Sequence, residues 1–247
     1  MKGLRAGWIA AGLLVALAIG AGAWIAARRS APTNAALDLR EAAARRIGQW
    51  LAEHARGQNV LVLSNPFTRD PGRPGPVYAF EAAGIRGLDR GWRGQLHLEA
   101  IVFPPIESAW ARQPEAAPID PASPTPLSYL LAADAWDQLL RQHPKADIWV
   151  SLIGVPLNLS ATKAWRQPDR PGIALLLPDM RMLGAGRAIE SAFRSGKLLA
   201  VVLNRPRPIP PDTGGSTSGA DEFDRHFLLV TADNVAEVHR RYPDLWP

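Results

Sequence analysis

NVLVLSN, residues Asn59–Asn65, is a short aliphatic run that ends in polar, turn-forming residues. A run of this length, rich in β-branched valine and bounded by turn residues, predicts a buried strand. Runs of the same kind recur along the chain at Gln95–Phe103, Asp147–Val155, Ile173–Asp179, Lys197–Asn204 and His226–Asp233. Because these runs are nearly continuous rather than alternating, they favour parallel strands that are covered on both faces.

Helical patterns lie between most of these strands. The expected helices begin at Asp38, with Glu41 in capping-box spacing, at Val77, at Thr125-Pro126 (running to about Gln142), at Asp179 and at Thr231. In the helix Val77–Trp92, Gly84, Gly87 and Gly91 share one face, which predicts close packing of that helix on the sheet. The alternation predicts an α/β fold: a doubly wound, mostly parallel sheet of five or six strands with helices on both faces.

The N-terminal stretch Gly7–Ala27 has no charged side chain and is followed by Arg28 and Arg29. With Ala6 the uncharged run has 22 residues, and a helix of that length is about 33 Å long, enough to cross a hydrocarbon core of about 30 Å. Trp8 and Trp24 lie near its two ends, where indole rings favour the membrane interface. The sequence predicts a retained transmembrane anchor. A signal peptide cleaved after the small residues 21–23 stays an alternative.

The predicted organisation is an anchor with basic flanks at residues 1–29, a tether at 30–37 and a single α/β domain at 38–247. The formal charge is +5, with 28 basic and 23 acidic residues. Four of the basic residues flank the anchor, so subtracting 4 from 28 leaves 24 basic against 23 acidic side chains. This near-neutral body argues against nucleic-acid binding. The N-terminal flank is slightly the more basic, which favours a single-pass cell-membrane protein with its domain outside the cytoplasm.

Three long connections follow predicted strands, at Pro66–Pro76, Pro104–Thr125 and Arg205–Asp224. The carboxyl ends of parallel strands share one edge, where open α/β sheets bind ligands. The ligand-binding residues expected at this edge are Asn65, Thr68, Arg69, Glu107, Trp110, Asp179, Asn204 and Arg205. Each has a structural alternative: the aspartate as a helix cap, the asparagines in turns, the tryptophan packing its loop and the arginines in solvent.

Catalytic signatures are missing from the sequence. It has no cysteine, no phosphate-binding loop, no HExxH, no GxSxG and no EF-hand loop. His97, His143 and His226 are expected at the edge of the sheet opposite the long loops, which argues against a histidine-based catalytic or metal site. No cofactor, metal or catalytic residue is therefore predicted. Glu107 with Asp179 is the pair that would support acid–base chemistry.

Three stretches share a helix-to-strand pattern: AIESAFRSGKLLAVVLNRP from Ala188, DEFDRHFLLVTADNV from Asp221, and DAWDQLLRQHPKADIWVSLIGVP, Asp134–Pro156. Together they cover roughly half of the chain and resemble one lobe of the sugar-type periplasmic solute-binding proteins. The resemblance implies an extracytoplasmic α/β ligand-binding domain. No diagnostic motif accompanies it, so it carries over no binding residue.

The sequence thus predicts a membrane-anchored, extracytoplasmic α/β domain that binds a small solute or a protein partner without catalysis. Its expected partners are the membrane, through residues 7–27, and a small molecule or an envelope protein. Two other functions stay open. One is an enzyme, a hydrolase or transferase using acids and arginines at the carboxyl edge. The other is a structural subunit of a cell-envelope assembly.

Overall fold

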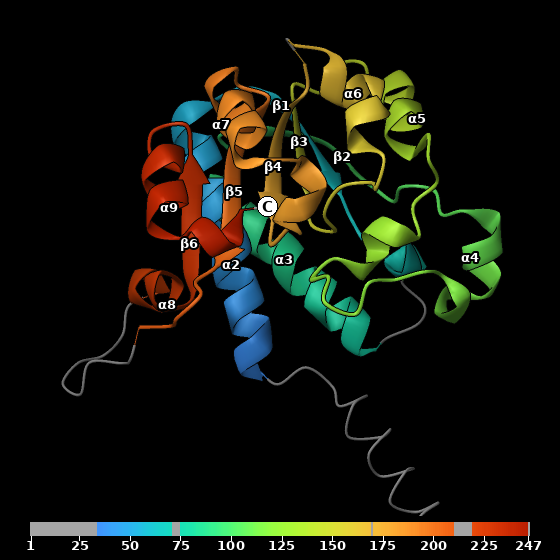
Figure 1. The fold of residues 1–247 in the computed structure, drawn as a ribbon, viewed down its shortest axis with the longest axis horizontal. Helices are drawn as coiled ribbons and strands as arrows, with labels where there is room; N and C mark the ends of the chain where they lie inside the picture. Colours follow the sequence, from blue (N-terminus) through green and yellow to red (C-terminus); the bar gives the residue numbers. More distant parts are fainter. Residues whose placement is uncertain (1–33, 71–74, 169, 210–218, 247) are drawn as a thin grey trace, which may run out of the picture.

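The computed structural model describes residues 34–70, 75–168, 170–209 and 219–246, which form a six-stranded sheet with helices on both faces (Figure 1). The strands are β1 (Asn59–Leu63), β2 (His97–Val102), β3 (Ile148–Ser151), β4 (Gly172–Leu176), β5 (Leu198–Asn204) and β6 (Phe227–Thr231). Their order is β2-β1-β3-β4-β5-β6, and only β6 runs antiparallel to its neighbour. The predicted mostly parallel α/β sheet is confirmed, and all six expected strands form.

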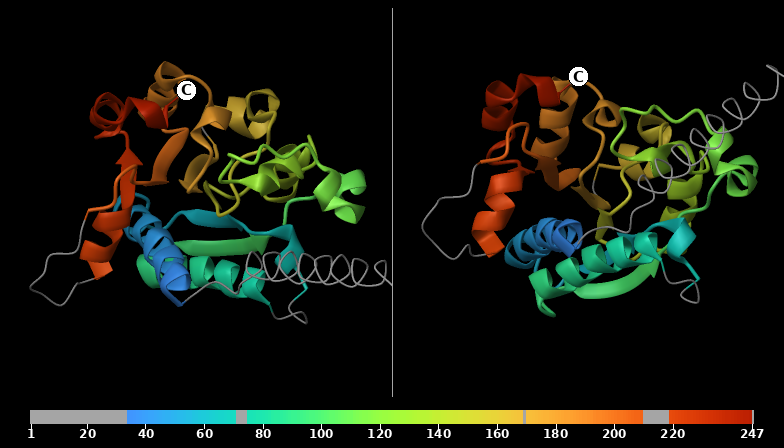
Figure 2. Two further views of the ribbon diagram at one scale, coloured as in Figure 1. Left: turned by 60° about the horizontal axis from the view of Figure 1, so that its bottom comes forward. Right: turned by 90° about the horizontal axis from the view of Figure 1, so that it is seen from below.

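Helices cover the two faces of the sheet in separate layers (Figure 2). One layer consists of α2 (Asn34–His54), α3 (Pro76–Trp92) and α8 (Gly219–His226). The other consists of α5 (Ala135–Gln142), α6 (Lys163–Arg166), α7 (Gly186–Arg194) and α9 (Val235–Arg241). A further short helix, α4 (Ser108–Arg112), lies in the long connection after β2, away from the sheet (Figure 1).

Strand β1 shows why the aliphatic runs are continuous. Leu61 and Leu63 point into the core on the α5 side, and Val60 and Val62 point into the core on the α2 side. None of these four side chains is more than 1% exposed. Each face of the sheet has its own core, so the positions that alternate along the strand must be apolar on both faces. Burying each such side chain stabilises the fold by about 1.5–3 kcal/mol.

The glycines of α3 pack against α2 rather than against the sheet, so the expected helix-on-sheet contact is wrong. A Cβ on Gly87 would lie 2.3 Å from the backbone oxygen of Glu41, and one on Gly91 would lie 2.4 Å from that of Arg45. On α2, a Cβ on Gly48 would lie 2.6 Å from the Leu88 backbone oxygen. The two helices therefore touch backbone to backbone, which only glycine permits.

The expected starts of the first and the last helix are also wrong. Helix α2 begins at Asn34, and Asp38 and Glu41 lie inside it. The Glu41 carboxylate forms ion pairs with Arg86 and Arg90 of α3 instead of a capping box. The last helix begins at Val235, after a turn in which the Thr231 backbone N–H donates to the side chain of Asn234.

The helix expected from Thr125 to Gln142 is interrupted. Its first part is a 3-10 turn, η3 (Pro126–Tyr129), and Leu131 then forms an isolated antiparallel bridge with Ile106 before α5 begins. Likewise Asp179 caps only a 3-10 turn, η5 (Met180–Leu183). Gly184 follows with φ +96°, a left-handed conformation that ends the turn before α7.

The expected position of His226 is wrong because β6 is antiparallel. The start of β6 pairs with the end of β5, Asn204 opposite Phe227, so His226 lies at the carboxyl edge of the parallel strands. Its Nε2 lies 3.3 Å from the Glu222 carboxylate within α8. His97, in contrast, lies at the start of β2, as predicted.

No helix among residues 34–246, as far as the structure describes them, is long and apolar enough to cross a membrane. The segment 7–27, for which the sequence predicts the anchor, lies outside the described residues. The anchor therefore stays a prediction, as does the division at residues 29 and 37.

Candidate ligand-binding site

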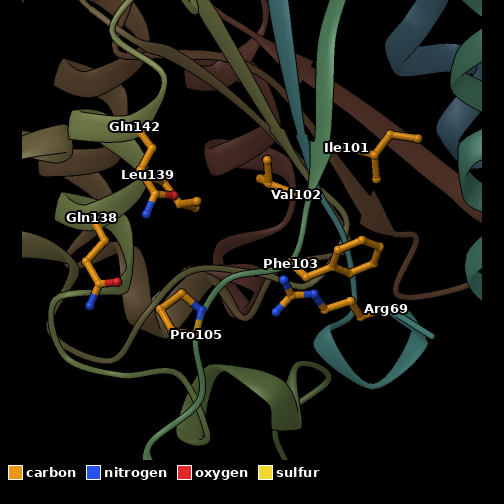
Figure 3. A pocket seen from close by; sticks show the side chains of 8 residues that line it. All are labelled: Arg69, Ile101, Val102, Phe103, Pro105, Gln138, Leu139 and Gln142. Carbon is orange, nitrogen blue, oxygen red and sulfur yellow. The ribbon is translucent and has the colours of Figure 1, made fainter.

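A cavity of about 370 Å³ opens between β2 and α5, beside the carboxyl ends of β1 and β2 (Figure 3). Its volume falls in the range of about 300–1,000 Å³ that is typical of small-molecule sites. The residues that line it are Arg69, Ile101, Val102, Phe103, Pro105, Gln138, Leu139 and Gln142. The lining combines one guanidinium group and two amides with apolar walls.

The turn after β1 positions Arg69. Asn65 caps the 3-10 turn η1 (Pro66–Thr68), with its side-chain oxygen accepting from the Phe67 backbone N–H at 3.0 Å. The Thr68 hydroxyl donates to the Asn65 backbone oxygen at 2.8 Å. Asn65 and Thr68 therefore serve as turn residues, and Arg69, at the end of the turn, extends toward the cavity (Figure 3).

Helix α5 supplies the opposite wall. Gln138 and Gln142 are four residues apart, so they share one side of the helix. Trp136 is fully buried and packs edge-on against Trp149 of β3, with ring centroids 5.4 Å apart, which fixes the rotation of α5. The Gln138 amide donates to the Asp134 carboxylate at 2.9 Å, which fixes its orientation.

A buried ion pair lies behind the turn that carries Arg69. Arg40 of α2 and Glu81 of α3 are 6% and 4% exposed, and the Arg40 Nη2 atom lies 3.4 Å from Glu81 Oε2. The same nitrogen donates to the Leu152 backbone oxygen at 2.8 Å. Glu81 Oε1 accepts from the Ser64 hydroxyl at 2.6 Å and from the Asn65 backbone N–H at 2.9 Å. The pair therefore joins two helices to the ends of β1 and β3.

Sequence reasoning missed this ion pair, although a signal was present. Arg40 precedes Ala43, Ala44 and Ile47 on the apolar stripe of its helix, and Glu81 precedes Gly84 on the glycine face of the other. Opposite charges on the inward faces of two neighbouring helices predict a buried pair. Burial lowers the pKa of Arg40, and the Glu81 carboxylate opposes that shift.

Asp179 binds Arg181 rather than facing the cavity. Arg181 Nε and Nη2 donate to the two Asp179 carboxylate oxygens at 2.9 and 2.6 Å, and Nη1 donates to Asp120 at 2.8 Å. Burial acts to raise the pKa of Asp179, but hydrogen bonds from Arg181 and Ser123 outweigh it and hold the pKa below its ordinary value of 3.8. The network fastens the connection after β2 to the end of β4.

Replacing Asp179 with asparagine is expected to lower the free energy of unfolding by about 1 kcal/mol near neutral pH, since the half-exposed Arg181 partner is screened by solvent. The folded-state pKa is depressed, so the carboxylate stabilises the fold above pH 3.8 and this contribution is lost as the pH falls through the folded-state value. Urea unfolding of both proteins at about pH 7 and about pH 3 checks this. A difference that grows toward acid pH would contradict it.

The remaining predicted site residues are dispersed. Glu107 accepts a hydrogen bond from the Ala133 backbone N–H at 3.2 Å, and Trp110 is half-buried on α4. Asn204 is exposed at the end of β5. Arg205 donates to the Asp224 backbone oxygen at 2.9 Å and to the Tyr242 hydroxyl at 3.0 Å. Of the eight predicted residues, Arg69 is the one that the cavity lining includes.

Glu107 and Asp179, the pair that would support acid–base chemistry, do not belong to the cavity lining. The described side chains that line the cavity include neither a carboxylate nor a histidine. Glu107 and Asp179 are each engaged with other groups and do not meet Arg69. Within the residues that the structure places, no group of three or more histidine, aspartate and glutamate side chains has the geometry to hold a metal ion.

No protein-family model and no curated protein matches the chain. One similar solved structure is a carbohydrate transporter solute-binding protein from Agrobacterium Radiobacter in complex with D-arabinose. It is 13% identical to this chain with a TM-score of 0.44, and the match covers 87% of this chain and 64% of that protein. An arabinose-binding protein from Geobacillus stearothermophilus is 10% identical with a TM-score of 0.44, over 80% of this chain and 62% of that one. A carbohydrate transporter from Acidothermus cellulolyticus 11B in complex with myo-inositol is 14% identical with a TM-score of 0.43, over 83% and 62%.

The chain spans less than two thirds of the length of each of these three proteins. The resemblance to sugar-type solute-binding proteins is confirmed as a distant structural one, and it extends over more of the chain than the half expected from sequence.

Proposed function

We propose that this chain is a solute-binding domain held at the outer face of the cell membrane, and that its ligand is a small hydroxylated carboxylate. The observation that carries the proposal is the cavity between β2 and α5, with one arginine and two glutamines in an otherwise apolar lining. Binding sites of this kind fix a ligand by a few polar groups within apolar walls.

Each part of the lining fits one part of such a ligand. The planar guanidinium of Arg69 matches a carboxylate and can donate two parallel hydrogen bonds to it. The amides of Gln138 and Gln142 offer both donors and acceptors, which suits hydroxyl groups. Phe103, Pro105 and the inner side of α5 offer apolar surface to the carbon skeleton.

The attachment to the membrane rests on sequence. The apolar segment 7–27 is long enough to cross a bilayer, and basic residues flank both of its ends. The N-terminal flank is slightly more basic, which favours an orientation with the folded domain outside the cytoplasm under the positive-inside rule.

Arg69→Ala tests the binding site. Titration calorimetry of the full chain in detergent with D-galacturonate is expected to show saturable binding that weakens about tenfold to a hundredfold in the variant, because hydrogen bonds to a charged group contribute about 1.5–3 kcal/mol. D-galactose, which lacks the carboxylate, is expected to bind more weakly than the acid and to lose less affinity in the variant.

Arg141→Ala is the matched control, since Arg141 is an exposed arginine of α5 outside the cavity lining and its loss changes the charge equally. Its affinity for D-galacturonate should equal that of the parent. Equal weakening by both variants would show a general charge effect, and no saturable binding of D-galacturonate, D-gluconate or D-glucuronate would overturn the proposal.

A further inference from the structure

Three exposed apolar side chains gather where α3 begins. Val77 and Phe80 are 50% and 36% exposed and lie three residues apart, on one side of α3. Phe67 is 42% exposed and belongs to η1, which contacts α3. The Tyr78 hydroxyl donates to the Asp70 backbone oxygen and so fastens the end of the η1 turn to α3. Phe67, Val77 and Phe80 are called the apolar patch below.

The apolar patch lies at the end of the molecule where the described chain begins. Helices α2 and α3 are parallel, since Gly84 lies against Arg40, Gly87 against Ala44 and Gly91 against Gly48. Residues that face each other on the two helices thus differ by 43 or 44 in number. With the same spacing at the beginning of the helices, the first turn of α3 lies level with Asn34. Both helices begin at the lower end of the molecule in Figure 1.

The chain between the predicted anchor and α2 is short. Four residues lie between Arg29 and Asn34, so five residue-to-residue steps join them, and at no more than about 3.6 Å per step an extended chain spans about 18 Å. If residues 7–27 cross a bilayer, Arg29 lies at its surface, and the start of α2 cannot lie farther than this from it. The apolar patch, level with that start, then faces the lipid.

We infer that the apolar patch inserts into the interfacial region of the lipid bilayer and orients the domain with the carboxyl edge of its sheet toward the membrane. The inference rests on the membrane attachment proposed above. Amphipathic surfaces of peripheral helices bury about 5–10 Å into the boundary between headgroups and acyl chains. Phe67, Val77 and Phe80 are uncharged and of the size that such insertion uses.

The surroundings of the apolar patch fit the headgroup layer. Asp70, whose backbone oxygen accepts from Tyr78, is exposed beside it, as is Arg69 at the end of η1. These charges have both signs, so the contact depends on apolar insertion rather than on anionic lipid. The same orientation places the cavity that Arg69 lines close to the membrane surface, and a solute would enter it from the side.

The absence of cysteine from the sequence allows a single-site test. The full chain with Val77→Cys is labelled with the fluorophore NBD and reconstituted in phosphatidylcholine vesicles that carry nitroxide-labelled phosphatidylcholine. Leu98→Cys is the matched control, because Leu98 is 47% exposed and packs near Leu88 and Trp92, toward the far end of α3. Unlabelled vesicles provide the reference emission, and circular dichroism checks the fold of both variants.

The Val77 label is expected to emit at shorter wavelength and to be quenched at least about twofold more strongly than the Leu98 label. Equal quenching of the two labels in a chain that floats with the vesicles would overturn the inference while leaving the anchor in place. A blue-shifted but unquenched Val77 label would also overturn it, since the patch would then be covered by protein. A chain that does not float with the vesicles would overturn the anchor and the inference together.

Discussion

Glu81→Ala is expected to lower the free energy of unfolding by about 3–5 kcal/mol, because it leaves the guanidinium of Arg40 buried without its ion-pair partner. The same change removes the acceptor of the Ser64 hydroxyl and the Asn65 backbone N–H. Since Asn65 begins the turn that carries Arg69, the affinity for D-galacturonate is expected to fall as well. Urea unfolding and titration calorimetry measure the two effects.

Asp89→Ala is the control, because Asp89 is an exposed carboxylate of the same helix and should change stability by no more than about 0.5 kcal/mol. A second variant separates loss of the pair from loss of packing. Replacing both Arg40 and Glu81 with methionine removes both charges, and should cost less than Glu81→Ala alone. If Glu81→Ala were no more destabilising than Asp89→Ala, the ion pair would not hold the two helices to the sheet.

Gly87→Ala is expected to destabilise the fold by about 3 kcal/mol, at the upper end of overpacking costs. The new Cβ would lie 2.3 Å from the Glu41 backbone oxygen and 2.9 Å from the Ala44 Cβ, so α2 and α3 must separate. Helix propensity predicts the opposite sign, since alanine is favoured over glycine in a helix by about 1 kcal/mol. The sign of the change therefore decides between packing and propensity.

Gly75→Ala serves as the control for this substitution. A Cβ at Gly75 would meet nothing within 4 Å, and its φ of −178° is extended backbone that any residue adopts. Thermal and urea unfolding should leave that variant within about 0.5 kcal/mol of the parent. A neutral or stabilising effect of Gly87→Ala would contradict the backbone contact between the helices.

The sheet could be predicted from sequence because both of its faces are buried. That burial forces the aliphatic runs at β1, β3, β4 and β5, and these runs need no knowledge of their partners. The direction of β6 could not be predicted in this way, since the same run of apolar residues fits either direction. The error placed His226 at the wrong edge.

The helices were less predictable where long-range contacts compete with local pattern. The apolar spacing around Leu131 suits a helix, but Leu131 pairs with Ile106, and the Ala132 backbone N–H donates to the Pro105 backbone oxygen at 2.9 Å. Similarly, Glu41 has the spacing of a capping box but pairs with arginines of α3. Neither contact leaves a local signal in the sequence.

The candidate cavity lies at the edge of the sheet where the sequence predicts a site, and its lining includes one of the eight predicted residues. Arg69 follows β1 and reaches the cavity, whereas Asp179 and Arg205 are bound by neighbouring groups. Gln138 and Gln142 could not be predicted in this way, because they lie on a helix and not in a loop that follows a strand. Both glutamines face β2 because of the rotation of α5 about its axis, and this rotation depends on the packing of Trp136 against Trp149.

The most direct test of solute binding in this cavity is a nuclear magnetic resonance titration of the full chain, labelled with 15N at glutamine, with D-galacturonate. The side-chain amides of Gln138 and Gln142 are expected to shift saturably, while that of the exposed Gln95, which precedes β2 at the opposite edge, stays unchanged. Saturable shifts elsewhere with these two amides unmoved, or no saturable shift at all, would contradict the account.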